Sequence, residues 1–295
     1  MDEIKKGRVD LFSSNELIKE RFRDMEDAYT REEHLYSIAN YSVGLDSLLS
    51  GLYRSDIIVV AGRPGAGKSA FVHNITNHMA MRDVPVLLCS PEMCKEMVSL
   101  RLLSIKSKVS CKKMEYGIIE EKDWPILTTA AGILVSVALN INNTFPLPVS
   151  EIFKIASELK TNNKLGLLVI DSLPFISAEG NKPEDIAVTI MMDLKRLARN
   201  LNIPVILTVP LTAESPDTLQ QIPCLNDIDS DRIVNIADVI ILLHKITNPN
   251  KQKCKVEALV AKNRNGAQGI VPFYFFYQSL CFEVFSVKEQ SSKIH

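Results

Sequence analysis

The chain has 295 residues, of which 46% are hydrophobic and 23% are charged, and its formal net charge is −1. This length and composition favour a soluble protein built from one large packed domain with an extension, or from two modest domains. A net charge near zero excludes a global attraction to nucleic acid or anionic membrane, so any contact with DNA must be confined to a groove or channel.

Residues 1–40 differ in composition from the rest and are predicted to form a helical N-terminal arm or linker. Ser14 followed by Leu17 and Ile18 predicts a short amphipathic helix. Two interpretations remain open. The helix is either solvated and frayed, or it docks its apolar stripe on a neighbouring subunit.

From Tyr41 onward, short β-branched runs bounded by polar residues predict buried parallel strands. These runs span residues 57–61, 84–89, 167–170, 203–209, 239–243 and 256–260. Amphipathic helical patterns lie between several of them, over residues 70–81, 150–160 and 185–200. Alternating strands and helices indicate an α/β fold with a mostly parallel sheet covered on both faces. Residues 273–276 and 280–285 predict a closing hairpin.

The segment after the first predicted strand matches the full G-x-x-x-x-G-K-[ST] pattern and opens a helix. Its glycines let backbone N–H groups surround phosphate oxygens, and the helix N-terminus adds partial positive charge. The sequence therefore predicts a site for ATP with Mg²⁺. Its expected residues are Gly62, Arg63, Pro64, Gly65, Ala66, Gly67, Lys68, Ser69 and Ala70.

Two acidic residues follow predicted strands near this loop. Asp171 comes directly after Leu167–Ile170, at a carboxyl strand end where ligands collect and where an Asp can bind Mg²⁺. Glu92 follows the second strand and suits a general base that orients the attacking water. Glu92 equally suits the first turn of a helix that begins near Pro91.

The six cysteines form no CxxC pair, and no histidine lies at zinc-ligand spacing to them. We interpret them as reduced, mostly buried thiols of a cytoplasmic protein. The N-terminal MDEIKKGRVD has no apolar signal core, and the longest apolar stretch, Ile126–Leu139, is too short to span a bilayer. We expect no membrane contact.

Six ordered blocks resemble the RecA-like C-terminal ATPase domain of DnaB-type replicative helicases, over roughly residues 41–285. This resemblance implies a RecA-like P-loop NTPase domain at residues 41–288 and absence of the family's N-terminal domain. Residues 289–295 are predicted to form a disordered tail. The blocks are Val43–Asp46 with Ser50–Leu52, the phosphate loop with Ser90–Met93, Arg101–Ser104, Leu167–Leu173, Asp193–Ala198, and Ala261–Gly266.

The resemblance also implies roles. Lys68 and Ser69 would bind phosphate and Mg²⁺, Glu92 would be the catalytic base, and Asp171 the acidic residue of the Mg²⁺ site. Lys262 and Arg264 would reach the γ-phosphate held by the adjacent subunit, with Arg264 as an arginine finger.

A fixed guanidinium would stabilise the charge that develops on the transferred phosphoryl group. From the residues alone, Lys262 and Arg264 could equally flank a hairpin turn before Asn265-Gly266.

The sequence departs from the family in three segments, one of which is Ile233-Val234-Asn235 in place of an isoleucine-glutamate-glutamine turn. Val209-Pro210-Leu211 stands where the family has a γ-phosphate-sensing glutamine, and proline offers no side-chain donor or acceptor. The family's second DNA-facing loop falls near residues 212–231, but no Lys or Arg occurs between Arg199 and Arg232. Lys182 is the obvious basic candidate in the first loop.

Three hypotheses follow. The leading one is an ATP-dependent helicase or translocase that acts on single-stranded DNA in replication as a homo-oligomeric, hexameric ring. The second is an accessory ATP-binding protein that assembles with itself or a host helicase and regulates or loads it. Partners would then include a primase, a loader or that helicase. The third, a recombinase-like or signalling relative, is disfavoured by the Lys262–Gly266 block.

Overall fold

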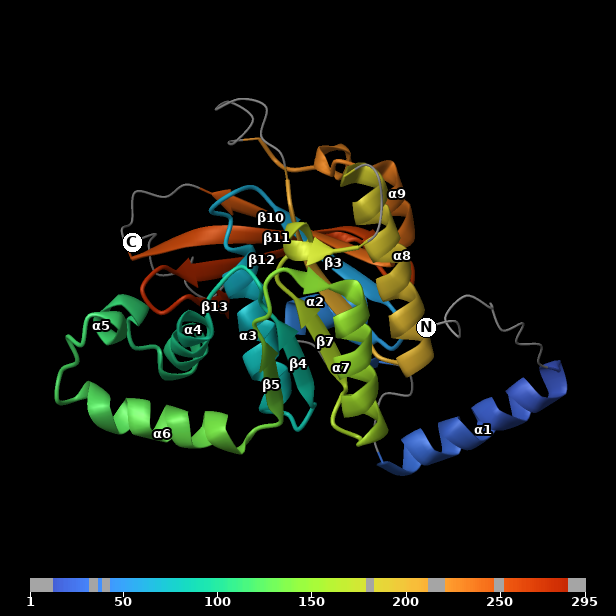
Figure 1. Ribbon diagram of the computed structural model, residues 1–295, viewed down its shortest axis with the longest axis horizontal. Coiled ribbons are helices and arrows are strands. Elements are labelled where there is room, and N and C mark those ends of the chain that lie inside the picture. The colour runs from blue at the N-terminus through green and yellow to red at the C-terminus, as the bar shows by residue number, and fades with distance from the viewer. Residues whose placement is uncertain are drawn as a thin grey trace, which may run out of the picture.

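The computed structural model describes residues 13–31, 37–38, 43–178, 183–211, 221–246 and 252–285. A nine-stranded sheet organises this part of the chain (Figure 1), with the strand order β13-β12-β11-β10-β3-β9-β7-β4-β5. The strands are β3 (Ile57–Gly62), β4 (Val86–Cys89), β5 (Leu139–Asn142), β7 (Leu167–Ile170), β9 (Val205–Pro210), β10 (Val239–Ile246), β11 (Lys253–Asn263), β12 (Gly269–Phe276) and β13 (Cys281–Val284).

The sheet is parallel from β10 through β5. Strands β11, β12 and β13 extend it by antiparallel pairing, and β12 with β13 forms the predicted closing hairpin. Two small pairs accompany the main sheet: β1 (Ser37–Ile38) with β2 (Leu52–Tyr53), and β6 (Leu147–Pro148) with β8 (Ile176–Ser177).

Helices flank the sheet on both faces, as the alternating pattern predicts. The helices of the described residues are α1 (Ser14–Arg31), α2 (Val43–Leu49), α3 (Lys68–Ala80), α4 (Lys95–Ser107), α5 (Cys111–Glu115), α6 (Asp123–Ser136), α7 (Val149–Thr161), α8 (Pro183–Leu201) and α9 (Asp231–Ile236). Short 3₁₀ turns lie at Leu173–Phe175 and Leu225–Asp227. The predicted helices and strand cores are therefore confirmed, with boundaries shifted by a few residues.

Strand β3 shows why its sequence lacks polar alternation. Ile58 and Val60 pack in one core cluster with α2, α3 and α4, whereas Ile57 and Val59 pack in a second with α7 and α8. All four side chains are buried, so both faces of the strand need apolar residues.

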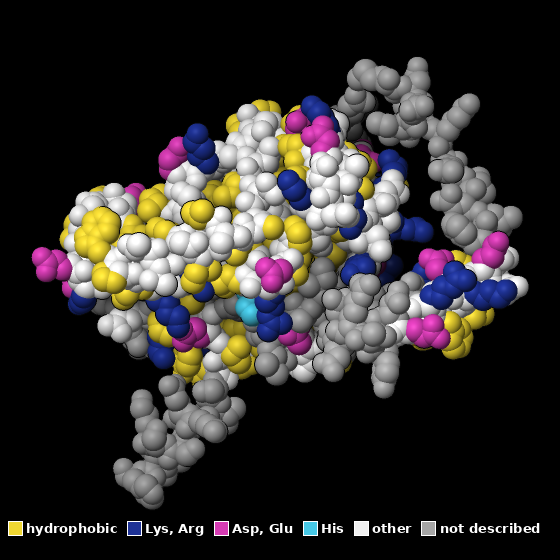
Figure 2. Space-filling model, turned by 90° about the horizontal axis from the view of Figure 1, so that it is seen from below, with side chains coloured by type: hydrophobic (Ala, Val, Ile, Leu, Met, Phe, Trp, Pro, Cys, Tyr) yellow, Lys and Arg dark blue, Asp and Glu magenta, His cyan; other side chains and the backbone are white. Residues whose placement is uncertain are grey.

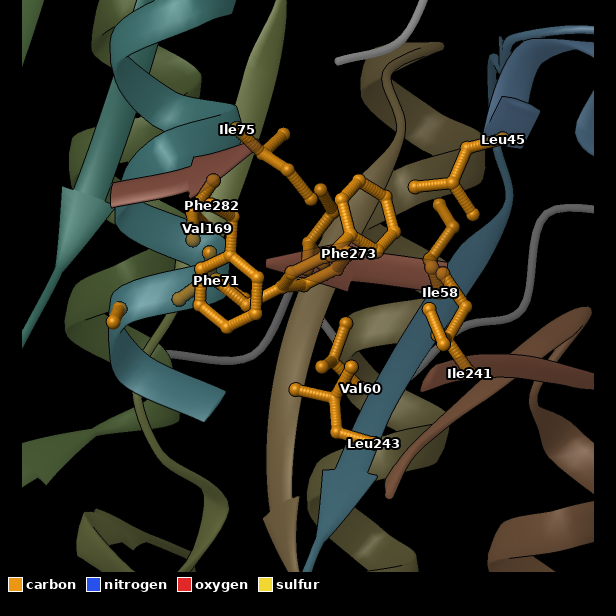
Figure 3. Packing of buried hydrophobic residues seen from close by; sticks show 14 of the residues in the cluster. Leu45, Ile58, Val60, Phe71, Ile75, Val169, Ile241, Leu243, Phe273 and Phe282 are labelled. Atoms are coloured by element: carbon orange, nitrogen blue, oxygen red, sulfur yellow. The ribbon is translucent and has the colours of Figure 1, made fainter. Parts of the chain in front are cut away.

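Aromatic side chains join the phosphate-loop helix to the closing hairpin. The Phe71 ring on α3 lies 5.2 Å from Phe282 and 5.7 Å from Phe273, both edge to face (Figure 3). These rings fix the start of α3 against β12 and β13, since edge-to-face pairs add specific attraction to the burial of apolar area.

The predicted N-terminal helix is confirmed as α1, which begins at Ser14. Ser13 and Glu16 form a reciprocal cap, in which the Glu16 N–H donates to Ser13 Oγ and the Ser13 N–H donates to the Glu16 carboxylate. Figure 1 shows α1 set apart from the α/β body. The boundaries of the arm and of the domain at residues 1–40 and 41–288 stay predictions, and residues 289–295 lie outside the described residues.

Candidate nucleotide-binding site

The phosphate loop connects the end of β3 to the first residue of α3. Gly65 and Gly67 have φ angles of 76° and 94°, a region that L side chains rarely adopt. A Cβ on Gly67 would lie 3.1 Å from the Phe282 ring. Glycine at this position therefore permits both the backbone conformation and the close approach of the hairpin. The N–H groups of the first turn of α3 point toward the loop, as at any helix N-terminus.

The Lys68 ammonium lies inside the loop. Its Nζ donates to the Gly62 carbonyl at 2.7 Å and to the Arg63 carbonyl at 3.3 Å. Burial lowers the pKa of Lys68, whereas Asp171 and Glu92 oppose that shift. The positive charge is thus held where the phosphates of a nucleotide would enter the cradle.

A buried carboxylate lies beside the start of α3. Asp171, at the end of β7, is 1% exposed. Its Oδ1 accepts hydrogen bonds from Ser69 Oγ at 3.2 Å and from Thr208 Oγ1 on β9 at 2.7 Å. The predicted pair of Ser69 and Asp171 is therefore brought together, while Thr208 was missed because only the pairing of β9 with β7 places it there.

The oxygen atoms of Ser69 and Asp171 are suitable ligands for a magnesium ion. Mg²⁺ is usually bound through one or two protein oxygens together with substrate phosphates, and the Ser69 hydroxyl and Asp171 carboxylate provide such oxygens. Asp171 Oδ2 is a buried charged oxygen with no hydrogen-bond partner in the described part of the chain. Within the same residues, no group of three or more His, Cys, Asp or Glu side chains could hold a metal alone.

Glu92 lies in a turn at the carboxyl end of β4, and its side chain is exposed. Burial of part of the carboxyl group and the neighbouring Asp171 raise the pKa of Glu92, while Lys68 and Arg101 lower it. The carboxylate therefore shares the electrostatic environment of Lys68 and Asp171, as a base at this site requires.

The alternative interpretation, in which Glu92 lies in the first turn of a helix that begins near Pro91, is wrong. Helix α4 begins at Lys95 with Cys94 as its N-cap. Asn143, which follows β5, donates to the carbonyls of Ser90 and Met93 and so stabilises the preceding turn in a non-helical conformation. Nothing in the local sequence indicates this contact from 50 residues away.

Arg63 was predicted to contribute to the phosphate cradle, but its side chain points elsewhere. It is 6% exposed and donates to the Gln221 carbonyl and to Asp227 Oδ2, the latter at 3.3 Å. The loop is thereby joined to the described segment that follows residues 212–220. Those residues, and Lys182, lie outside the described residues, whereas residues 221–231 of the second predicted DNA-facing loop are described and include Asp227.

Lys262 and Arg264 lie near the amino-terminal ends of the parallel strands, whereas the phosphate loop lies at their carboxyl ends. Asn263 pairs with Val239, and Val239 pairs with Ile58 near the beginning of β3. Ile58 is four residues before Gly62, which corresponds to about 13 Å along the strand at about 3.3 Å per residue. The structure therefore does not bring these two cations to the phosphate loop of their own chain.

Both cations bind the C-terminal end of α9 instead. Lys262 Nζ donates to the carbonyls of Val234, at 2.7 Å, and Ala237, at 2.6 Å. Arg264 Nη2 donates to the Asn235 carbonyl at 2.8 Å. These contacts satisfy helix-terminal carbonyls. Strands β11 and β12 do form a hairpin, with Arg264 in its connection, and the role of Lys262 and Arg264 toward a neighbouring subunit stays a prediction.

Pro210 occupies the last position of β9, directly opposite Gly62 in the parallel register. The residue at the expected sensor position is therefore beside the phosphate loop, and its side chain carries no polar group.

Residues 38–284 match the sequence profile described as the DnaB-like helicase C terminal domain. The chain belongs to this family. It is 31% identical over 269 residues to the replicative DNA helicase DnaB of Geobacillus stearothermophilus, and 30% identical over 269 residues to the replicative DNA helicase DnaC of Bacillus subtilis strain 168. In both cases the match covers 88% of this chain and 59% of the relative, so the chain spans less than two thirds of either relative.

Solved structures agree with this DnaB-like assignment. A DnaB-like replicative helicase, solved in a study of its interactions with primase, gives a TM-score of 0.80 at 25% identity, covering 96% of this chain and 70% of that chain. A separately solved ATPase domain also gives 0.80 at 25% identity, covering 94% and 100%. The predicted RecA-like α/β fold is therefore confirmed. In the described residues, no helix is both long and apolar enough to cross a membrane, and the six cysteines are free, four of them buried.

Proposed function

We propose that this DnaB-like chain is an ATP-hydrolysing helicase or translocase that acts on single-stranded DNA in replication as a hexameric ring. The observation that carries the proposal is that the required groups lie at opposite ends of the parallel strands. Lys68, Ser69 and Asp171 meet at the carboxyl ends, whereas Arg264 lies near the amino-terminal ends. A complete site then needs two copies of the chain.

In this proposal ATP binds with its phosphates against the loop and Lys68. Magnesium, when bound, would be held by Ser69 and Asp171 and would neutralise charge on the phosphates. Glu92 accepts the proton of the attacking water and aligns it with the γ-phosphorus. Its raised pKa favours proton acceptance, since a base works best when its pKa approaches the ambient pH.

Lys262 and Arg264 of an adjacent copy would complete the site from outside. The Arg264 side chain is 51% exposed, so it can exchange its contacts with Asp238 and the Asn235 carbonyl for a phosphate. A head-to-tail contact between identical subunits closes into a ring when the rotation permits. Hydrolysis would then depend on the interface, and the interface would respond to the nucleotide.

Exposed apolar surface supports self-assembly. Trp124, Ile126 and Val135 of α6 are 56%, 47% and 87% exposed. Hydrophobic side chains gather at the α6 end of the molecule in Figure 2. Helix α1 carries its own exposed apolar residues, including Ile18 and Phe22 at 57% and 63%. We propose that the α1 stripe of one subunit packs on the α6 surface of the next, because large exposed patches mark interaction sites.

An accessory ATP-binding role is the alternative, with a primase, a loader or a host helicase as partner. Pro210 beside Gly62 and the lack of Lys or Arg between Arg199 and Arg232 favour it. In this case the nucleotide would control assembly with another helicase, while contact with phosphate backbones would be weak.

Steady-state ATP hydrolysis with and without single-stranded DNA separates the two functions. A motor should show strong stimulation by DNA, with activity that requires both Lys68 and Arg264. An accessory protein should bind ATP without responding to DNA. The Lys68→Ala variant is the control for contaminating ATPases, and salt titration of any DNA affinity would count the phosphate contacts.

A further inference from the structure

A buried histidine faces the magnesium-site carboxylate. His73 is fully buried on α3, one helical turn after Ser69. Residues four apart lie on the same face of a helix, so Ser69 and His73 both face Asp171. The His73 Nε2 atom is 3.7 Å from Asp171 Oδ2.

The hydrogen bonds of Asp171 are unequally divided between its oxygens. Oδ1 accepts from Ser69 and Thr208, whereas Oδ2 has no donor in the described part of the chain. Both ring nitrogens of His73 likewise lack a hydrogen-bond partner there. Buried polar atoms are rarely left unpaired, and here a potential donor and a charged acceptor face each other slightly beyond bonding distance.

Nε2 can donate a hydrogen bond to Oδ2 both in the neutral Nε2–H tautomer and in the protonated imidazole. Burial lowers the pKa of His73 to about 4, against the opposing effect of Asp171. A neutral imidazole carries one N–H and one bare nitrogen. The Nε2–H tautomer supplies the single donor that Oδ2 needs.

We propose that His73 is a positioning residue for the magnesium site, donating from Nε2 to Asp171 Oδ2 once magnesium and nucleotide are bound. A hydrogen bond to Oδ2 would fix the plane of the carboxylate, so that Oδ1, the oxygen next to Ser69, would stay available to the ion. Outer hydrogen bonds that orient metal-binding side chains commonly change metal affinity by about 10- to 100-fold. This inference rests on the proposed function, since it assumes a Mg²⁺–nucleotide complex at the loop.

Three variants of the full chain separate positioning from packing. His73→Leu introduces an apolar side chain of similar volume and removes the donor. His73→Gln places an amide N–H₂ near the position of Nε2, whereas His73→Asn places it near Nδ1. The probe is a fluorescent ATP analogue titrated with Mg²⁺, and Mn²⁺ paramagnetic resonance gives metal affinity directly. Binding of the same analogue in EDTA reports the integrity of the pocket.

We expect His73→Leu and His73→Asn to raise the Mg²⁺ concentration for half-maximal binding by about 10-fold or more, with binding in EDTA unchanged and His73→Gln close to wild type. Equal Mg²⁺ requirements in all four proteins, or a parallel loss in EDTA, would overturn the positioning role. If His73→Leu does not fold, the comparison of Gln with Asn decides. If the wild-type protein binds no nucleotide, the proposed function itself is refuted. If the wild-type protein binds normally and the variants show the same Mg²⁺ requirement, only the positioning role of His73 is refuted.

Discussion

Arg264 Nη1 lies 3.2 Å from Asp238 Oδ1, and the Lys195 ammonium lies 2.5 Å from the other carboxylate oxygen. Asp238 is 2% exposed and also accepts the Ile57 N–H at 2.8 Å. One buried carboxylate therefore anchors the beginning of β3 and holds the proposed arginine finger beside α9.

Asp238→Ala should destabilise the fold strongly, because it leaves the Ile57 N–H without its acceptor and the Lys195 ammonium with the Ser55 carbonyl but no carboxylate. Removing one partner of a buried ion pair typically costs about 3–5 kcal/mol, and we expect the low end because Lys195 is partly exposed. Arg264→Ala should change the unfolding free energy by less than about 1 kcal/mol, as for exposed pairs. Urea denaturation of both variants measures the contrast; equal losses would contradict this assignment.

Arg264→Ala should lower the turnover number for ATP by about 10³-fold or more, the usual contribution of an arginine finger, while nucleotide affinity stays nearly intact. Steady-state kinetics together with equilibrium binding of an ATP analogue test this. Unchanged turnover would show that Arg264 does not reach a phosphate.

Gly67→Ala should abolish nucleotide binding and weaken the fold. The new Cβ would meet the Phe282 ring at 3.1 Å, and the φ of 94° is strained for alanine. Gly132→Ala is the matched control, because Gly132 lies inside α6 with nothing within 4 Å of an added Cβ. That change should stabilise by about 0.5–1 kcal/mol. Thermal unfolding with and without nucleotide distinguishes them.

The carboxyl group of Asp56 should make stability fall as pH rises. Burial and the nearby Asp238 raise the pKa of Asp56 to about 6, above the unfolded value of about 3.9. The folded chain thus holds the proton more tightly, and the resulting stability is present below about pH 4 and is lost progressively up to about pH 6.

Asp56→Asn should therefore be more stable than wild type by about 1–2 kcal/mol at pH 8, a figure reduced for partial solvent screening. At pH 4 the two proteins should be nearly equal, since the wild-type carboxyl group is then protonated. Urea denaturation at both pH values measures the difference. If the two proteins differ in unfolding free energy by the same amount at pH 4 and pH 8, the effect comes from packing and not from the protonation of Asp56.

Local patterns predicted the parts of the site that depend on chain neighbours. A buried strand, a glycine turn and a helix are contiguous, so the cradle around Lys68 could be located from the residues alone, and Asp171 followed from its place at a strand end. The remaining features depend on contacts between distant segments. Asn143 fixes the turn at Glu92, and Asp227 draws the Arg63 side chain away from the cradle.

His73 shows the same limit more sharply. In the sequence it is one polar residue in a mostly buried helix, and no short motif includes it. Its relation to Asp171 exists because β7 ends beside the first two turns of α3. The locations of Lys262 and Arg264 were likewise open until the register of β10 and β11 placed them near the amino-terminal ends of the parallel strands.

The most direct test of a shared nucleotide site is to mix Lys68→Ala and Arg264→Ala subunits and measure ATP hydrolysis. Each variant alone lacks half of every site. If the finger acts between subunits, random mixing restores a complete pair at about a quarter of the interfaces, and hydrolysis should reappear. If activity stays at the level of the separate variants although mixed oligomers form, the claim that a neighbouring subunit completes the site is contradicted.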